Sequence, residues 1–97
     1  VGFNIDNVRW GPGETLFAAG HVGPTRAAIG ECIRQRQCDG VTSRVAQISL
    51  QSLTANEIVR YPSNDLLILG TVAIQVGDEI WVGGVAGGDR IARFPAP

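Results

Sequence analysis

Hydrophobic and polar side chains alternate along most of this chain, which is the pattern expected of β-strands with one buried face. The alternation is clearest in residues 4–21, where two runs rich in β-branched and aromatic residues flank a Gly-Pro-Gly sequence at positions 11–13. Glycine and proline supply the backbone angles of a tight reversal, and β-branched and aromatic residues favour strands. These residues therefore predict a β-hairpin in which Trp10 faces Thr15 across a turn at residues 11–14.

The register of this hairpin decides which polar side chains come together. Counting outward from the turn places Asp6 opposite Ala19 and Asn4 opposite His21, and directly paired residues share a face of the sheet. Asn4, Asp6 and His21 would then lie together at the open end of the hairpin, with Asn7 beside them on the other face. A shift of one residue would move each side chain to the opposite face.

The alternation stops after the hairpin, and apolar side chains recur at helical spacing instead. They are Ala28, Ile29, Cys32 and Ile33. Pro24 suits the first turn of a helix, whereas Gly30 weakens one. We expect a short helical or loop insertion near residues 24–36, within a connection spanning residues 22–43. It would be either a lid over the open end of the hairpin or a surface excursion.

Further strands follow the insertion, in two units. The predicted strands are residues 44–50, 55–61, 71–76, 79–85 and 90–94. Gly77-Asp78 suits a two-residue hairpin turn, and residues 86–89 predict another turn. Asn64-Asp65 could be a ligand pair, but an ordinary turn is the preferred interpretation. Residues 1–62 thus form a four-stranded unit and residues 63–97 a three-stranded one, in a single partial domain.

The shorter second unit leaves strand edges without partners. An unpaired edge exposes a row of backbone donors and acceptors, which invites association. The chain also lacks methionine and begins in the middle of a pattern. We therefore expect a partner across the open edges, either the rest of the same protein or identical chains.

Composition excludes two classes of partner. The 97 residues include eight Arg, no Lys and nine acidic residues, for a net charge of −1. No basic cluster is present, so we expect no nucleic-acid partner. No apolar run approaches the roughly 18 residues of a membrane-spanning helix.

Cys32 and Cys38 are the only cysteines. Their spacing differs from the Cys-x-x-Cys spacing of zinc and redox sites. The preferred interpretation is a local disulfide, which would indicate a periplasmic or secreted protein. The alternative is a pair of free thiols.

Several short motifs carry a family resemblance. An Asp-Asn pair at positions 6–7 enters the first strand, and the second strand ends in Gly-His at positions 20–21. Near the C-terminus the chain reads Leu-Gly-Thr-Val-Ala at 69–73, Glu-Ile-Trp-Val-Gly-Gly at 79–84 and Asp-Arg-Ile-Ala-Arg at 89–93. In this order the motifs resemble the last two blades of the calcium-dependent six-bladed β-propellers, which include gluconolactonases, senescence-marker-protein-like lactonases and paraoxonases.

The resemblance implies an all-β chain of about two antiparallel propeller blades, residues 1–62 and 63–97. A blade takes roughly 40–50 residues, and two blades do not close a propeller.

The resemblance also implies a calcium site and a hydrolytic function. By motif, Asp6 and Asn7 would be calcium ligands, and His21 would line the active-site mouth as a base or as a wall of the pocket. Thr71 would be another wall residue, and the hairpin register adds Asn4. In this family the calcium polarises the carbonyl of a small-molecule lactone or ester and stabilises the oxyanion formed when water attacks.

Ordinary structural roles compete with these assignments. Asp6 and Asn7 could be a turn or capping pair, and His21 could be a packing residue. Two ligands also cannot complete the six to eight oxygens that calcium requires. The chain would therefore be at most part of an active site.

Two other functions remain open. One is a non-catalytic, propeller-like module that self-associates or binds a small molecule. The other is the strictosidine-synthase-like branch of these propellers, which catalyses a condensation without this metal role. The Asp6-Asn7 pair argues against that branch.

Overall fold

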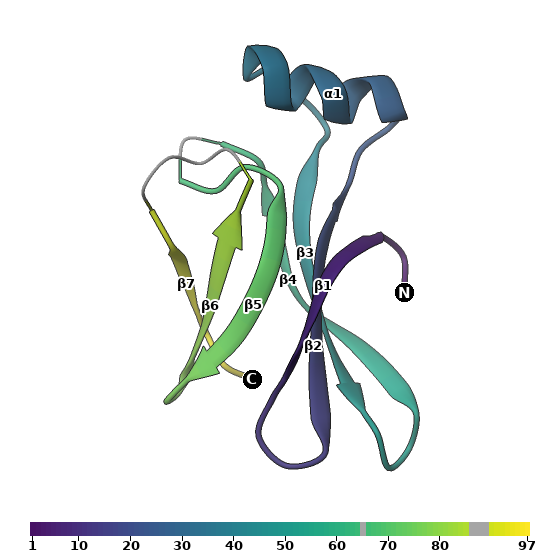
Figure 1. The fold of residues 1–97 in the computed structure, drawn as a ribbon, viewed down its shortest axis with the longest axis vertical. Coiled ribbons are helices and arrows are strands. Elements are labelled where there is room, and N and C mark those ends of the chain that lie inside the picture. The colour runs from purple at the N-terminus through teal and green to yellow at the C-terminus, as the bar shows by residue number, and fades with distance from the viewer. Residues whose placement is uncertain (65, 86–89) are drawn as a thin grey trace.

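The computed structural model describes residues 1–64, 66–85 and 90–97 and shows an all-β chain with one helix, as the alternation predicted (Figure 1). Strands adjacent in sequence pair in two antiparallel sheets, a four-stranded one in the order β1-β2-β3-β4 and a three-stranded one in the order β5-β6-β7. The elements are β1 Asn4–Trp10, β2 Thr15–Val22, α1 Arg26–Gln35, β3 Thr42–Ser49, β4 Thr54–Pro62, β5 Gly70–Val76, β6 Glu79–Gly84 and β7 Ala92–Pro95.

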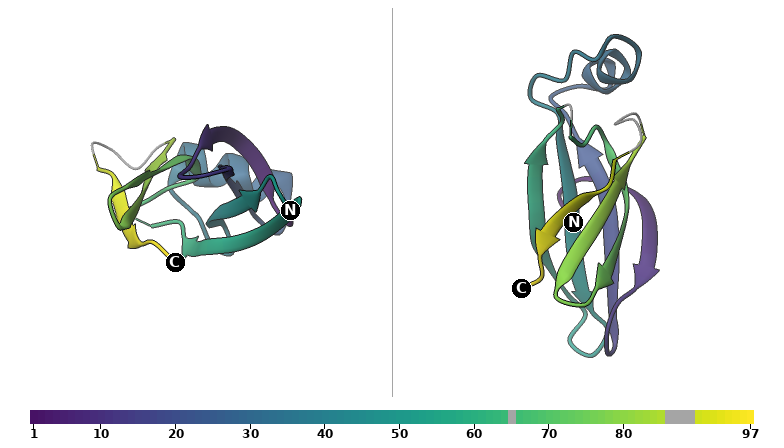
Figure 2. Two further views of the ribbon diagram at one scale, coloured as in Figure 1. Left: turned by 90° about the horizontal axis from the view of Figure 1, so that it is seen from below. Right: turned by 90° about the vertical axis from the view of Figure 1, so that its left-hand side faces the viewer.

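The two sheets pack face to face around one apolar core (Figure 2). Alternate side chains of both sheets point into it, because successive side chains of a strand point to opposite faces. The buried members are Phe17, Ala19, Val45, Val59, Leu67, Ala73, Ile80 and Val82. Each large side chain buried in this way contributes roughly 1.5–3 kcal/mol relative to exposure, so this core holds the two sheets together.

The predicted turns of the two main hairpins are present. Gly13 has a φ of 64° in the β1–β2 turn and Gly77 a φ of 61° in the β5–β6 turn. This left-handed conformation is accessible to glycine at little cost. The other predicted turns fall partly or wholly on Asp65 and residues 86–89, which lie outside the described residues.

The predicted register of the first hairpin is wrong over most of its length. Trp10 pairs with Leu16 and not with Thr15, and Ala19 pairs with Asn7 and not with Asp6. The turn is one residue longer than expected, and a bulge near the open end leaves one residue of β1 out of the pairing. The longer turn and the bulge shift the register in opposite directions, so the predicted pairing of Asn4 with His21 is restored beyond the bulge.

Both hairpins bulge at the same place, just inside their open ends. The pairing omits Asp6 in β1 and Thr71 in β5. A glycine of the partner strand pairs with the residue before each bulge, Gly20 in β2 and Gly84 in β6. A Cβ at Gly20 would collide with the backbone of Asn4, and one at Gly84 would collide with the carbonyl oxygen of Ile68. Glycine is therefore required beneath each bulge.

The predicted helical insertion is confirmed as α1, which lies across the end of the first sheet where β2 ends and β3 begins (Figure 1). Thr25 caps its N-terminus, since the Thr25 hydroxyl oxygen accepts a hydrogen bond from the Ala28 N–H at 3.1 Å. Arg36 ends the helix in the left-handed conformation, with a φ of 59°.

Cys32 and Cys38 form a disulfide that ties the C-terminal end of α1 to the following loop. The preferred interpretation of the two cysteines is thus confirmed. Disulfides persist in oxidising compartments, which indicates a location outside the cytosol. In the described part of the chain, no helix has the length and hydropathy needed to span a membrane.

Candidate functional site

The open end of the β1–β2 hairpin meets the beginning of β5, and most of the predicted site residues lie there. Asn4 pairs with His21 as predicted. Asp6 is exposed on the bulge, and Asn7 is half-buried where β1 lies against β5. Thr71 occupies the bulge of β5. Because these strands come from different sheets, packing of the sheets is what brings the residues together.

Asn7 links the two sheets by a hydrogen bond. Its side-chain Nδ2 donates to the Thr71 carbonyl oxygen at 2.9 Å and to Asp6 Oδ1 at 3.3 Å. Both amide hydrogens are therefore used, and none of the described residues donates to Asn7 Oδ1. Asn7 Oδ1 and the Asp6 carboxylate are thus hard oxygen donors on adjacent residues, the type that calcium prefers.

His21 is half-buried at the end of β2, and its Nδ1 lies 3.3 Å from the Gly70 carbonyl oxygen. A carbonyl only accepts, so the neutral imidazole forms this hydrogen bond when Nδ1 carries the proton. The Nε2 lone pair then remains available to accept a proton or to bind a ligand. The contact with Gly70 orients the ring, as the backbone partners of functional histidines do.

Thr71 presents its backbone carbonyl to the site and its hydroxyl elsewhere. The Thr71 Oγ1 donates to the Gly83 carbonyl oxygen at 3.3 Å, within its own sheet. The Thr71 hydroxyl therefore stabilises the β5–β6 hairpin, while its carbonyl fixes Asn7. Thr71, which was predicted to be a wall residue, thus contributes to the site through its backbone carbonyl.

Three residues that support the site were missed from the sequence. Buried Ser43 accepts a hydrogen bond from the Gly70 N–H at 2.8 Å, and Ser63 accepts one from the Leu69 N–H at 3.2 Å. Leu69 has a φ of 54°, which is uncommon for a branched residue. The glycine that follows Leu69 was the available signal, since it admits the close approach of Ser43 to the backbone.

The metal-binding capacity of this site is partial. Among the described residues, no group of three or more His, Cys, Asp or Glu side chains lies close enough to hold a metal ion. Asp6 and Asn7 supply oxygens of the right chemistry, whereas calcium takes six to eight oxygen ligands. The two residues therefore fit a calcium ion as part of a ligand set that other polypeptide segments or water would complete.

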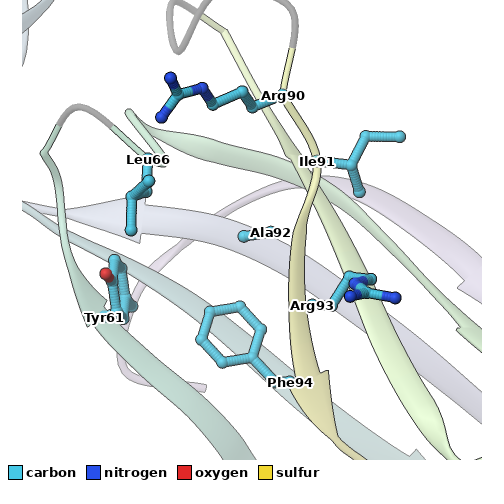
Figure 3. A pocket seen from close by; sticks show the side chains of 7 residues that line it. All are labelled: Tyr61, Leu66, Arg90, Ile91, Ala92, Arg93 and Phe94. Atoms are coloured by element: carbon cyan, nitrogen blue, oxygen red, sulfur yellow. The ribbon is translucent and has the colours of Figure 1, made fainter.

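A concave surface lies between β4 of the first sheet and β7 of the second (Figure 3). This groove has a volume of about 440 Å³. Tyr61 of β4 and Phe94 of β7 pack edge to face inside it, with ring centroids 5.5 Å apart. The groove residues are Tyr61, Leu66, Arg90, Ile91, Ala92, Arg93 and Phe94. The groove runs beside β7, which pairs with β6 and with no other strand of the described residues.

The strongest electrostatic cluster lies on the outer face of the first sheet. The Glu57 carboxylate accepts from Arg44 at 3.0 Å and from Arg60 at 2.9 Å. Desolvation alone would raise the pKa of Glu57, but the Arg60 hydrogen bond and the charges of Arg44 and Arg60 outweigh it and lower that pKa below its ordinary value. This cluster has a structural role, since it ties β3 to β4.

Comparison with protein-family models, curated proteins and solved structures finds no match to this chain.

Proposed function

We propose that this chain supplies part of the active site of a calcium-dependent hydrolase that acts on small-molecule lactones or esters. The observation that supports the proposal most is that Asn7, which is bonded to Asp6, and His21 each form a hydrogen bond with a backbone carbonyl of β5. It joins two oxygen donors to an oriented imidazole in the order that the resemblance to gluconolactonases and paraoxonases implies. By that resemblance the chain would form about two blades of a β-propeller.

Each residue has a role in this proposal. Asp6 and Asn7 would hold the ion through side-chain oxygens, and the hydrogen bond to the Thr71 carbonyl fixes the Asn7 side chain. His21 Nε2 accepts a proton from the attacking water, because its Nδ1 is engaged by Gly70. When bound, calcium would polarise the scissile carbonyl and stabilise the developing oxyanion. The disulfide favours a periplasmic or secreted setting for the reaction.

The test is a calcium titration followed by NMR. We expect the backbone amides of Asp6 and Asn7 and the His21 ring to shift, with a dissociation constant of about 1 mM or weaker because two oxygens make a poor shell. Asp6→Asn should abolish the shifts. Asp78→Asn, an equal change of charge in the β5–β6 turn, is the matched control and should leave them intact.

Two results would contradict the calcium site. One is the same calcium response in Asp6→Asn as in the unmodified chain. The other is the lack of any response at Asp6 and Asn7 up to about 20 mM, a concentration that saturates even a weak extracellular-type site.

A second function, self-association as a non-catalytic module, is supported by the surfaces that the fold leaves open. The outer face of the second sheet carries an apolar hollow of about 150 Å³ lined by Val72, Ile74, Trp81, Gly83 and Ile91. The outer face of the first sheet exposes Val8 and Trp10. Adjacent apolar residues of this kind mark interaction surfaces.

Light scattering coupled to size exclusion separates the two functions. A discrete trimer of the 97-residue chain would favour self-association, since three two-blade units would close a six-bladed ring. A monomer would favour the hydrolase, in which other segments of a larger protein would cover the open faces. Calcium-dependent tightening of a trimer would support both functions at once.

A further inference from the structure

A continuous series of hydrogen bonds joins the disulfide loop to the connection that leads into β5. The Cys38 carbonyl accepts from the Val41 N–H at 3.0 Å, and the Val41 carbonyl accepts from the Ser63 N–H at 2.9 Å. The Ser63 hydroxyl oxygen then accepts from the Leu69 N–H at 3.2 Å. The loop that the disulfide closes is thus connected to the residue directly before the carbonyls of the candidate site.

Apolar packing joins the same parts. A buried cluster beneath α1 contains Cys32, Val41, Ile68 and Leu69, with Ala28, Ile29 and Cys38 packed against it. The Leu69 side chain is fully buried there. Its left-handed backbone persists only where the surroundings determine it. The α1 cluster therefore fixes the conformation of Leu69.

The backbone conformation of Leu69 sets the orientation of the two peptide units that follow it. Gly70 presents its carbonyl to His21, and Thr71 presents its carbonyl to Asn7. A change of the Leu69 backbone toward the right-handed or extended region would turn these carbonyls. The His21 and Asn7 side chains would then each lose a hydrogen-bond acceptor.

We propose that the Cys32–Cys38 disulfide is a redox-sensitive device that positions His21 and Asn7 through the segment 67–71. A dithiol reductant transfers two electrons and two protons to the disulfide. The S–S bond breaks, Cys32 and Cys38 become thiols, and the reductant closes to its own cyclic disulfide. Reduction frees the C-terminal end of α1 and loosens its packing on Leu69.

The physical coupling is independent of any reaction, whereas its regulatory meaning rests on the proposed hydrolytic function. In the oxidised chain the site is ordered, and in the reduced chain the His21 ring loses its fixed acceptor. Oxidising surroundings would then keep the site ordered.

Amide hydrogen exchange by NMR tests the coupling, in the oxidised chain and after reduction by dithiothreitol. The Leu69 and Gly70 amides, which donate to Ser63 and Ser43, should lose about tenfold or more in protection as the segment opens locally. The ring signals of His21, the only histidine, should shift. The Leu50 amide, which donates to Glu14 at the far end of the first sheet, is the internal control and should stay within about twofold.

The proposal is overturned if the cysteine Cβ shifts report reduction while Leu69, Gly70 and His21 stay unchanged. If Leu50 loses protection as well, the reduced chain has unfolded, and oxidised Ser63→Ala decides the question. That variant breaks the series of bonds with the disulfide intact, so it should lower Leu69 protection and move the His21 signals. Ser52→Ala, an exposed serine in the distant β3–β4 turn, is its control.

No calcium or ester enters these measurements. A failed calcium titration would therefore leave the coupling standing, and unchanged Leu69 and His21 would leave the calcium site standing.

Discussion

The β1–β2 and β5–β6 hairpins share one backbone design and carry different chemistry on it. In each hairpin one residue bulges near the open end, and a glycine of the partner strand pairs with the residue just before it. The first hairpin places Asp6-Asn7 there, and the second places Thr71-Val72. Bulges redirect side chains next to functional sites. The comparison indicates that the bulge is a structural requirement of both hairpins, while the acid, the amide and the imidazole are specific to the first.

The second hairpin still contributes to the site, through its main chain. The backbone carbonyl oxygens of Gly70 and Thr71, at the start of β5, form hydrogen bonds with the side chains of His21 and Asn7 in the other sheet. One hairpin therefore provides functional side chains, and the other provides the acceptors that hold them. Three predictions test the comparison of the two hairpins and of the sheets to which they belong.

The largest effect is expected from adding a methyl group beneath either bulge. Gly20→Ala and Gly84→Ala should each lower the free energy of unfolding by about 3 kcal/mol, because the new Cβ meets backbone atoms that cannot move aside cheaply. Urea unfolding measures the loss. Gly83→Ala is the matched control, since its Cβ would lie an ordinary 3.4 Å from the Val72 side chain, and it should cost less than about 0.5 kcal/mol. Equal losses at all three positions would refute the shared design.

A smaller effect is expected from removing the hydrogen bond that Asn7 of the first hairpin donates to Thr71 of the second. Asn7→Ala should lower the free energy of unfolding by about 1 kcal/mol, because the Thr71 carbonyl loses its side-chain donor. The His21 ring signals should move little, because its own acceptor is Gly70. Asn56→Ala, at an exposed position of β4, controls for loss of an asparagine from a strand. An unchanged stability in Asn7→Ala would mean that the hydrogen bond from Asn7 to Thr71 adds nothing to the packing of the two sheets.

The smallest effect concerns the ion pairs of the two sheets. Glu57 lies between Arg44 and Arg60. Among the described residues, Glu79 has a single ion-pair partner, Arg93 at 3.5 Å, and it also accepts a hydrogen bond from Trp81 Nε1 at 3.2 Å. The pKa of Glu57 is lowered in the folded chain. Its stabilisation is therefore complete above the ordinary value of 4.5 and is lost as the pH falls through the lower folded pKa.

Glu57→Gln should accordingly reduce stability by about 0.5 kcal/mol at pH 7 and by progressively less below pH 4.5. Thermal unfolding from pH 7 to pH 3 would show the curves of the two proteins converging. Glu79→Gln is the comparison variant and should change the profile less. A constant difference between Glu57→Gln and the unmodified chain across this range would contradict the assignment.

Local patterns in the sequence predicted the strands, the helix and the disulfide, because alternation, helical spacing and glycine turns act over a few residues. The register of the first hairpin could not be predicted in this way, because the bulge at Asp6 depends on the second sheet, to which Asn7 is bonded. The pairing of Asn4 with His21 was nevertheless correct. The longer turn moved the register by one residue, and the bulge restored it.

The support of the site could not be predicted for the same reason. Ser43 and Ser63 look like ordinary serines, and their importance comes from backbone contacts: Ser43 with Gly70, 27 residues later, and Ser63 with Leu69, across a connection of irregular backbone. No local pattern reports such an approach. The side chains of the candidate site were thus visible in the sequence, and the backbone that positions them was not.

The outer faces of the two sheets, which both expose apolar side chains, have a consequence for symmetry. They belong to different sheets, so a contact between the outer face of β5–β7 in one copy and the outer face of β1–β4 in another joins two different surfaces. Such a head-to-tail contact leaves one unused face at each end of every pair. Copies would continue to add until the rotation between neighbours closes a ring, and any other rotation would produce an open filament.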